Sequence, residues 1–309
     1  MATARTVQGV ATIDLPQRRA SAGLWSNAWY RLRRDRLTIG STVVVLLLIL
    51  LSLAAPLVSQ YVLQMSFEQQ DLLHTYSVPT LDPPGYILGS DEVGRSQAVR
   101  LLYGGQVSLF VGFVAAFIQL TIGVCLGLVA GYTRGRTDDV ITWFITTLNS
   151  IPAIFLLIIF AALFTPGPLT LTLIIGALFW TGITNFVRGQ TFSLREREFI
   201  TAARTIGASS RRIMFRHILP NVLPLIFVLT AIDVGSIILL ESALSYLGLG
   251  IMPPTPSWGN MLTNAATYFN RAWWLVVSPG AMIFLTVLCL YLVGDGLRDA
   301  LDPRLRGEK

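Results

Sequence analysis

The sequence predicts an all-α integral membrane protein with six transmembrane helices. More than half of the 309 residues are hydrophobic (53%), only 13% are charged, and the arginines cluster between long apolar runs. A soluble domain of this size would carry about 25% charged residues. The net charge of +6 would also suit nucleic acid, but the arginines occupy short segments of the kind that the positive-inside rule places in the cytoplasm. We therefore expect the protein to lie in the lipid bilayer and not to bind nucleic acid.

The N-terminal part of the chain predicts one membrane helix between two polar segments. Residues 1–36 contain seven arginines and are expected to form a cytoplasmic tail that ends in an interfacial helix. The apolar run at 37–58 is long enough for the first transmembrane helix, which needs about 20 residues. Residues 59–104 contain three prolines and only two basic residues, so we expect an external loop.

Residues 105–299 are expected to form a core of five further transmembrane helices. The apolar runs lie at 107–130, 140–164, 169–187, 221–247 and 275–293. Gly123 and Gly127 lie one helical turn apart, which permits close helix packing, and Pro152 predicts a kink in the third span. Residues 300–309 are expected to form a cytoplasmic tail. With both ends inside, 20 of the 23 basic residues lie on the cytoplasmic side, as the positive-inside rule requires.

The residues that most often bind metals are scattered. Cys125 and Cys289 lie inside apolar runs, where cysteine usually serves as a packing residue. His74 and His217 have no partners at ligand spacing. We therefore expect neither a metal site nor a disulfide.

Residues 195–220 form a polar segment in an otherwise apolar chain. Helical spacing relates Phe199, Ala202, Ala203 and Ile206, while Glu198, Thr201 and Arg204 fall on other faces of the same short helix. Gly207 is expected to end this helix with a positive φ, and Ser209 or Ser210 to cap a second one. The segment could serve as a docking element for another protein or simply lie among lipid headgroups.

The pattern of Ala202-Ala203, Gly207 and Leu219-Pro220 resembles the cytoplasmic EAA loop of permease subunits of binding-protein-dependent ABC importers. In that family the loop forms a coupling helix that docks into the ATPase subunit. The resemblance implies an ATPase-coupling role for the residues Glu198, Thr201, Ala202, Ala203, Arg204 and Gly207. Thr201 stands where the motif has a glutamate, and Trp143 and Thr146 replace an arginine and an aspartate that the family usually carries.

Three further stretches resemble the C-type subunit of the dipeptide/oligopeptide branch. They read LGSDEVGR at 88–95, LLYGGQVSL at 101–109 and LGIMPPTPSWGNML at 249–262. The resemblance implies the type I ABC importer permease fold in a bacterial or archaeal inner membrane. It also implies a second homologous permease subunit, two ATP-binding subunits and an extracytoplasmic peptide-binding protein as partners.

ATP chemistry is expected on the partners and not on this chain. The sequence has no Gly-Lys-Ser/Thr phosphate loop. We therefore expect a transporter subunit rather than an enzyme, with no catalytic residue and no cofactor of its own, and with ATP and Mg²⁺ held by the ATPase subunits.

Two acidic residues, Asp233 and Glu241, fall inside the fifth predicted span. A carboxylate at the centre of a membrane helix costs about 2.5–3.5 kcal/mol on insertion scales, so both are expected to face a cavity or a neighbouring helix. They could line a wet translocation pathway that accepts a peptide's amino group, or make interhelical hydrogen bonds.

Other functions remain open on the sequence alone. Nickel, metallophore or glutathione import by the same ABC class is one alternative, because that branch shares the signatures. An ion-coupled secondary transporter would use Asp233 and Glu241, although no internal repeat supports it. A membrane scaffold without transport activity is a third.

Overall fold

The computed structural model describes residues 29–165 and 167–301, and within these ranges the regular elements are helices. The α-helices are α2 (Arg36–Leu53), α3 (Ala55–Leu57), α4 (Gln97–Thr133), α5 (Arg136–Asn149), α6 (Ala153–Leu163), α7 (Pro168–Leu178), α8 (Thr181–Arg195), α9 (Glu198–Thr205), α10 (Ser210–Ile213), α11 (Leu219–Tyr246), α12 (Ala265–Tyr268) and α13 (Trp274–Leu301). Two π-helices, Val58–Leu63 and Met214–Ile218, extend α3 and join α10 to α11. The predicted all-α class is confirmed. Most of the predicted N-terminal tail and of the C-terminal tail lies outside the described residues.

Five helical stretches are long and apolar enough to cross a membrane, and a bent pair supplies a sixth. The five are Arg36–Leu53, Gln97–Thr133, Pro168–Arg195, Ser210–Tyr246 and Trp274–Leu301. The third predicted span is split into α5 and α6, whose axes differ by 80°. The break ends at Pro152, the residue that predicted a kink, which precedes the first turn of α6. Its missing N–H and fixed φ end a continuous helix there.

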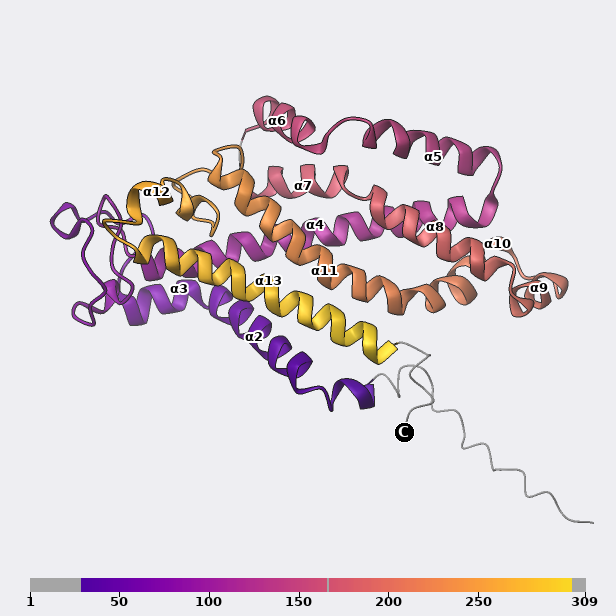
Figure 1. Cartoon of the computed structure of the whole chain (residues 1–309), viewed down its shortest axis with the longest axis horizontal. Coiled ribbons are helices and arrows are strands. Elements are labelled where there is room, and N and C mark those ends of the chain that lie inside the picture. The colour runs from indigo at the N-terminus through magenta and orange to yellow at the C-terminus, as the bar shows by residue number, and fades with distance from the viewer. Residues whose placement is uncertain (1–28, 166, 302–309) are drawn as a thin grey trace, which may run out of the picture.

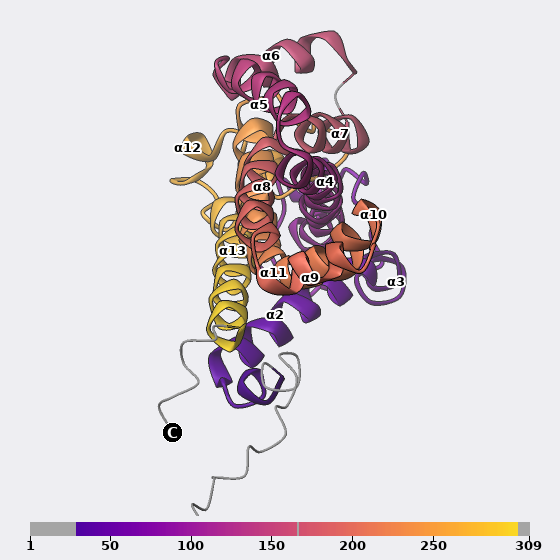
Figure 2. The ribbon, with the colours of Figure 1, turned by 90° about the vertical axis from the view of Figure 1, so that its right-hand side faces the viewer.

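The long helices run side by side, and the remaining elements gather at the two ends of the bundle (Figure 1). Residues 59–96 and α12 lie at one end, which we name the loop end. The short helix α9 lies at the opposite end, which we name the α9 end. Viewed from there, α9 runs across the bundle while α5 and α6 lie along one edge (Figure 2).

Helix α4 begins earlier than its apolar run predicts. It starts at Gln97 rather than at 107, and the Ser96 side chain caps it by accepting a hydrogen bond from the backbone N–H of Val99. Residues 97–101 are buried and therefore pack against the rest of the bundle. The predicted external loop thus ends at 96, because its last residues are held in a helix by tertiary contacts that hydropathy does not register.

Helix α4 packs closely against α8 through glycines spaced four residues apart. A methyl group added at Gly127 would lie 2.8 Å from the backbone oxygen of Thr184, and one at Gly131 would lie 2.8 Å from that of Arg188. One at Gly123 would lie 3.1 Å from the Trp180 oxygen. The predicted close packing at Gly123 and Gly127 is confirmed, and its partner is α8.

Large apolar side chains cover the outside of the bundle. Exposed examples are Leu46, Leu47 and Leu50 on α2, Phe117 on α4, Phe155 and Ile159 on α6, and Phe284 on α13. Water-soluble monomers do not expose apolar surface this continuously. A hydrocarbon environment satisfies these side chains, because the backbone polar groups beneath them are already paired within the helices.

Candidate functional site

The segment 195–220 folds into two short helices around a glycine turn. Gly207 follows α9 with φ +86°, and its N–H donates to the Arg204 oxygen at 3.0 Å. The Ser209 side chain caps α10 by accepting from the Arg212 N–H at 3.4 Å. Both local predictions, the positive-φ glycine and the serine cap, are confirmed. Beyond its two chain neighbours, no atom of residues 29–165 and 167–301 lies within 4 Å of a side chain added at Gly207, so the constraint there is the backbone conformation and not crowding.

Helix α9 is fixed to the bundle by one face. Ile200 is fully buried and Ala203 is 7% exposed, whereas the other α9 residues with a predicted coupling role, Glu198, Thr201, Ala202 and Arg204, are exposed. Of the apolar residues placed on one face by their spacing, only Ala203 is buried, whereas Phe199 is 45% and Ile206 is 85% exposed. Two apolar stripes share this helix, and the one containing the isoleucine at 200 turns inward.

An apolar cluster holds Ile200 in place. Its buried members are Leu128, Tyr132, Ile183, Val187, Ile200, Ile213, Met214, Ile218, Val222 and Ile226. They come from α4, α8, α9, α10, the adjoining π-helix and α11. A rigid displacement of α9 is therefore coupled through side-chain packing to three of the long helices.

Polar contacts tie the base of α9 to the end of α4. The Arg195 guanidinium donates to the backbone oxygen of Tyr132 at 2.5 Å, and Arg134 pairs with Glu196 at 2.8 Å. The guanidinium of Arg134 also lies over the Phe192 ring. These contacts join the α4–α5 turn to the α8–α9 turn. The base of α9 is therefore fixed by polar contacts as well as by packing.

A bidentate ion pair links α5 to α8. Arg188 donates through Nε and Nη2 to the two carboxylate oxygens of Asp138, at 2.5 and 2.8 Å. This is the fork geometry that makes Arg–carboxylate pairs specific. The sequence analysis missed the pair, because 50 residues separate its members and no local pattern relates them. The family's arginine and aspartate positions, Trp143 and Thr146, are both exposed on α5.

Glu241 is the centre of a buried polar cluster near the loop end. Its side chain has no exposed surface, and its carboxylate accepts hydrogen bonds from Ser108 at 2.9 Å and Ser245 at 2.8 Å. Ser108 in turn accepts from the backbone N–H of Trp258 at 3.2 Å. Within this chain, Glu241 therefore makes the interhelical hydrogen bonds that were the alternative to a pathway role.

Asp233 lies two turns earlier on α11, in a different setting. It is half-buried, and its Oδ2 has no hydrogen-bond partner within the described ranges 29–165 and 167–301. Eight helical residues separate the two acids by about 12 Å along the axis. Asp233, Glu241 and α9 are thus three separate places in the fold and do not form one site.

A bundle of membrane-length helices with one short helix across its end defines a multi-pass membrane protein. Comparison with known families gives the particular assignment. Residues 123–307 match the model of the binding-protein-dependent transport system inner membrane component, and residues 23–84 match the N-terminal transmembrane domain of oligopeptide transport permease C. The chain belongs to this family of inner-membrane transport components.

Similar proteins cover nearly the whole chain. The oligopeptide transport system permease protein OppC of Haemophilus influenzae is 38% identical over 92% of this chain and 89% of its own length. OppC of Escherichia coli is 38% identical over 92% of both. The dipeptide transport system permease protein DppC of Bacillus subtilis is 36% identical over 94% and 88%. Among solved structures, a chain of the inward-facing MetNI methionine ABC transporter aligns at 18% identity with a TM-score of 0.47, over 65% of this chain and 96% of that chain.

Proposed function

We propose that this chain is one permease subunit of an ATP-driven, binding-protein-dependent importer of di- and oligopeptides. Membership of the family supports a transport role, and the relatives named above are oligopeptide and dipeptide permeases. In this proposal the chain forms half of a translocation pathway, and a second homologous permease subunit forms the other half. Import of nickel, metallophores or glutathione by the same class is the alternative for the cargo.

Helix α9 is the proposed contact with the ATP-binding subunits. The observation that carries this role is its one-sided burial: Ile200 and Ala203 anchor the helix, while Glu198, Thr201, Ala202 and Arg204 stay exposed. The exposed Phe199 and Ile206 add apolar surface that a protein groove would cover. Two ATP-binding subunits would hold ATP and Mg²⁺, and their closure would move α9 together with the long helices packed on its base.

The α9 end is proposed to face the cytoplasm. Seven arginines lie between 188 and 216 and two in the α4–α5 turn, whereas the loop end carries three, which are Arg95, Arg100 and Arg271. The positive-inside rule then places the N- and C-termini in the cytoplasm and the loop end outside. An extracytoplasmic peptide-binding protein would dock at the loop end, and the host would be a bacterial or archaeal inner membrane.

The two membrane acids are assigned different roles within this proposal. Asp233 is the pathway candidate, because the residue is only half-buried and its Oδ2 has no hydrogen-bond partner in the part of the chain that the structure describes. Glu241 instead holds α4, α11 and residues 251–260 together. A secondary transporter would use both acids as an ion site, and the two serine hydrogen bonds of Glu241 disfavour that use.

Affinity purification of the chain from native membranes in mild detergent, followed by mass spectrometry, tests the proposal. We expect a second permease and ATP-binding subunits to accompany it. Reproducible isolation without any ATP-binding subunit would reject the proposal and leave Asp233 as the starting point for an ion-coupled mechanism.

A further inference from the structure

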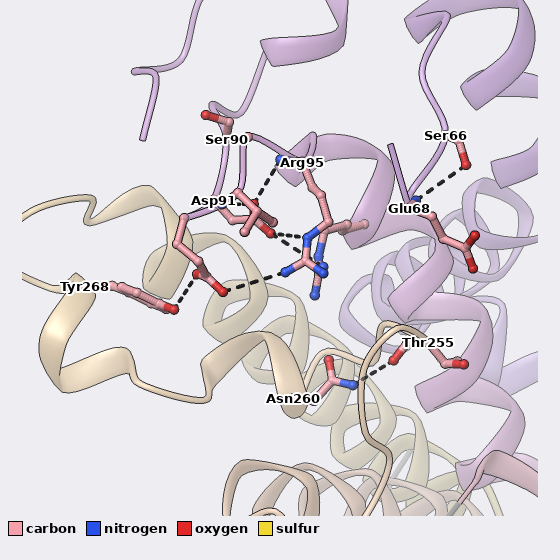
Figure 3. A network of polar contacts seen from close by, with 12 residues as sticks. Ser66, Glu68, Ser90, Asp91, Arg95, Thr255, Asn260 and Tyr268 are labelled. Atoms are coloured by element: carbon pink, nitrogen blue, oxygen red, sulfur yellow. Dashed lines mark hydrogen bonds and ion pairs between the residues drawn. The ribbon is translucent and has the colours of Figure 1, made fainter. Parts of the chain in front are cut away.

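A cavity of about 300 Å³ lies at the loop end, between the beginning of α4 and the segment that follows α11. Asp91 and Arg95 lie on one side of it, and Tyr268 and Asn260 lie on the later segment facing them (Figure 3). Arg100, in the first turns of α4, also lines the cavity. None of the functions proposed above uses this cavity.

Arg100 is the unusual residue of this cavity. It is only 5% exposed, and its Nη1 has no hydrogen-bond partner within residues 29–165 and 167–301. The nearest carboxylate oxygen, Oδ2 of Asp91, lies 3.5 Å from Nη1. A buried guanidinium is costly unless acceptors satisfy its five N–H groups, so this side chain needs a further acceptor.

The neighbouring carboxylates are already engaged. Asp91 Oδ1 accepts from the backbone N–H groups of Val93 at 3.1 Å and of Arg95 at 2.9 Å. Asp91 Oδ2 accepts from Arg95 Nε at 2.7 Å. Glu92 accepts a hydrogen bond from the Tyr268 hydroxyl. The two acids therefore have other partners in the cavity wall, and Asp91 reaches Arg100 only through the 3.5 Å contact with Nη1.

The Tyr268 contact is a stable part of this wall. Burial, with the hydrogen bond to Glu92, raises the pKa of the Tyr268 hydroxyl to about 12. The hydroxyl therefore stays protonated at neutral pH and continues to donate to Glu92. One Glu92 oxygen therefore stays engaged by Tyr268.

The rest of the cavity suits a carboxylate that carries an apolar group beside it. Ile251, Met252, Pro253 and Leu275 supply an apolar wall beside the arginine. The planar fork of a guanidinium matches the two oxygens of a carboxylate, and burial strengthens the pair. A side chain next to the bound carboxylate would pack against the apolar wall.

We propose that this cavity binds a carboxylate group through Arg100. Two sources present that chemistry at the loop end. One is the C-terminal carboxylate of a peptide, which rests on the proposed function; the other is an Asp or Glu side chain of a protein that docks there.

Three acetylated tripeptide probes distinguish the sources. N-acetyl-trialanine carries only a C-terminal carboxylate, its C-terminal amide carries none, and N-acetyl-Ala-Glu-Ala amide carries only a side-chain carboxylate. Their binding would be measured by ligand-observed NMR, without ATP, to the full chain in lipid nanodiscs together with the subunits that co-purify with it. We expect the uncharged amide to bind at least about tenfold more weakly than a carboxylate probe, the loss expected for one charge-assisted interaction.

The relative affinities of the three probes show which source of carboxylate the cavity binds. Preference for N-acetyl-trialanine assigns the site to a peptide C-terminus, and preference for the glutamate probe assigns it to a docked protein. Equal binding of all three probes, or binding of none, would overturn the proposal.

Two sets of variants connect the binding to this cavity. Arg100→Gln is expected to lower the affinity of the preferred carboxylate probe at least about tenfold. Because a buried arginine can also matter for folding, Met252→Glu gives a second test at a position that is 46% exposed. Its carboxylate would compete for Arg100, whereas the matched Met252→Gln would not. Equal probe affinity in the two Met252 variants would contradict the site.

The result of the probe-binding experiment does not depend on whether α9 contacts the ATP-binding subunits. Probe binding is measured without ATP and at the end of the bundle opposite α9. Loss of the carboxylate site would leave the association with ATP-binding subunits intact, and absence of those subunits would leave probe binding measurable.

Discussion

Ser108 on α4 donates a 2.9 Å hydrogen bond to Glu241 on α11, and the same hydroxyl accepts the backbone N–H of Trp258. One serine therefore connects two long helices to the folded segment 251–260. Both contacts are buried, so each group depends on the other for its hydrogen bonding. This relationship explains how an acidic side chain is tolerated inside a membrane helix.

Replacement of Ser108 by alanine is expected to destabilise the protein by about 1–3 kcal/mol, because it leaves a carboxylate oxygen and a backbone N–H without a buried partner. Thermal unfolding in detergent measures the effect. Ser193, which is exposed on α8, provides the control, and Ser193→Ala should change the midpoint little. Equal midpoints for the two variants would contradict the role of Ser108.

Substitution of Gly207 by valine is expected to disturb the turn after α9. A β-branched residue at φ +86° is strained by about 1–2 kcal/mol or more, so α9 should be misplaced while the protein still inserts in the membrane. Peptide uptake and peptide-stimulated ATP hydrolysis by the assembled transporter measure the consequence, which we expect to be uncoupling. Gly182→Ala is the control, because Gly182 lies within α8 and has open space around it. Normal uptake and normal stimulation in Gly207→Val would argue against a coupling role.

Alanine variants of the two α9 isoleucines are expected to have different effects, one on the stability of the protein and the other on its binding to the ATP-binding subunits. Ile200→Ala should cost about 2–4 kcal/mol, because it empties a fully buried position. Ile206→Ala should change stability by no more than about 0.5 kcal/mol, because the side chain is 85% exposed, yet it should weaken the retention of ATP-binding subunits. Denaturant unfolding and co-purification yields measure the two effects. The assigned orientation of α9 would be refuted if Ile206→Ala were the more destabilising variant.

Asp138→Asn is expected to loosen α5. Only Asp138 and Ile145 are buried among the α5 residues, so loss of the ion pair to Arg188 removes a main attachment of this helix and should cost about 1–3 kcal/mol. Hydrogen exchange of the α5 amides should become faster. The adjacent Asp139 is exposed, and Asp139→Asn should leave exchange unchanged. Similar exchange in both variants would show that α5 is held by other contacts.

The sequence was sufficient for features that depend on local chemistry. Apolar run lengths located the spans, Pro152 located the break between α5 and α6, and Gly207 with Ser209 located the turn after α9. Each of these depends on backbone preferences that a residue carries with it, so no knowledge of the packing was needed.

Features created by packing were beyond the sequence. Ile200 and Phe199 lie on competing apolar stripes of one short helix, and only the cluster beneath α9 decides which stripe turns inward. The Arg188–Asp138 pair and the burial of Arg100 likewise depend on which helices become neighbours. Hydropathy also placed Arg100 in a loop, although it lies buried in α4.

Site-specific photocrosslinking shows whether exposed residues of α9 contact an ATP-binding subunit. Benzoylphenylalanine would replace Thr201 in the transporter assembled in native membranes, with the same probe at Leu73, which is 92% exposed in the segment 59–96, as the control. We expect a crosslink from position 201 to an ATP-binding subunit and none to that subunit from position 73. Crosslinks from position 201 to lipid alone, in a complex that retains its ATP-binding subunits, would contradict this contact.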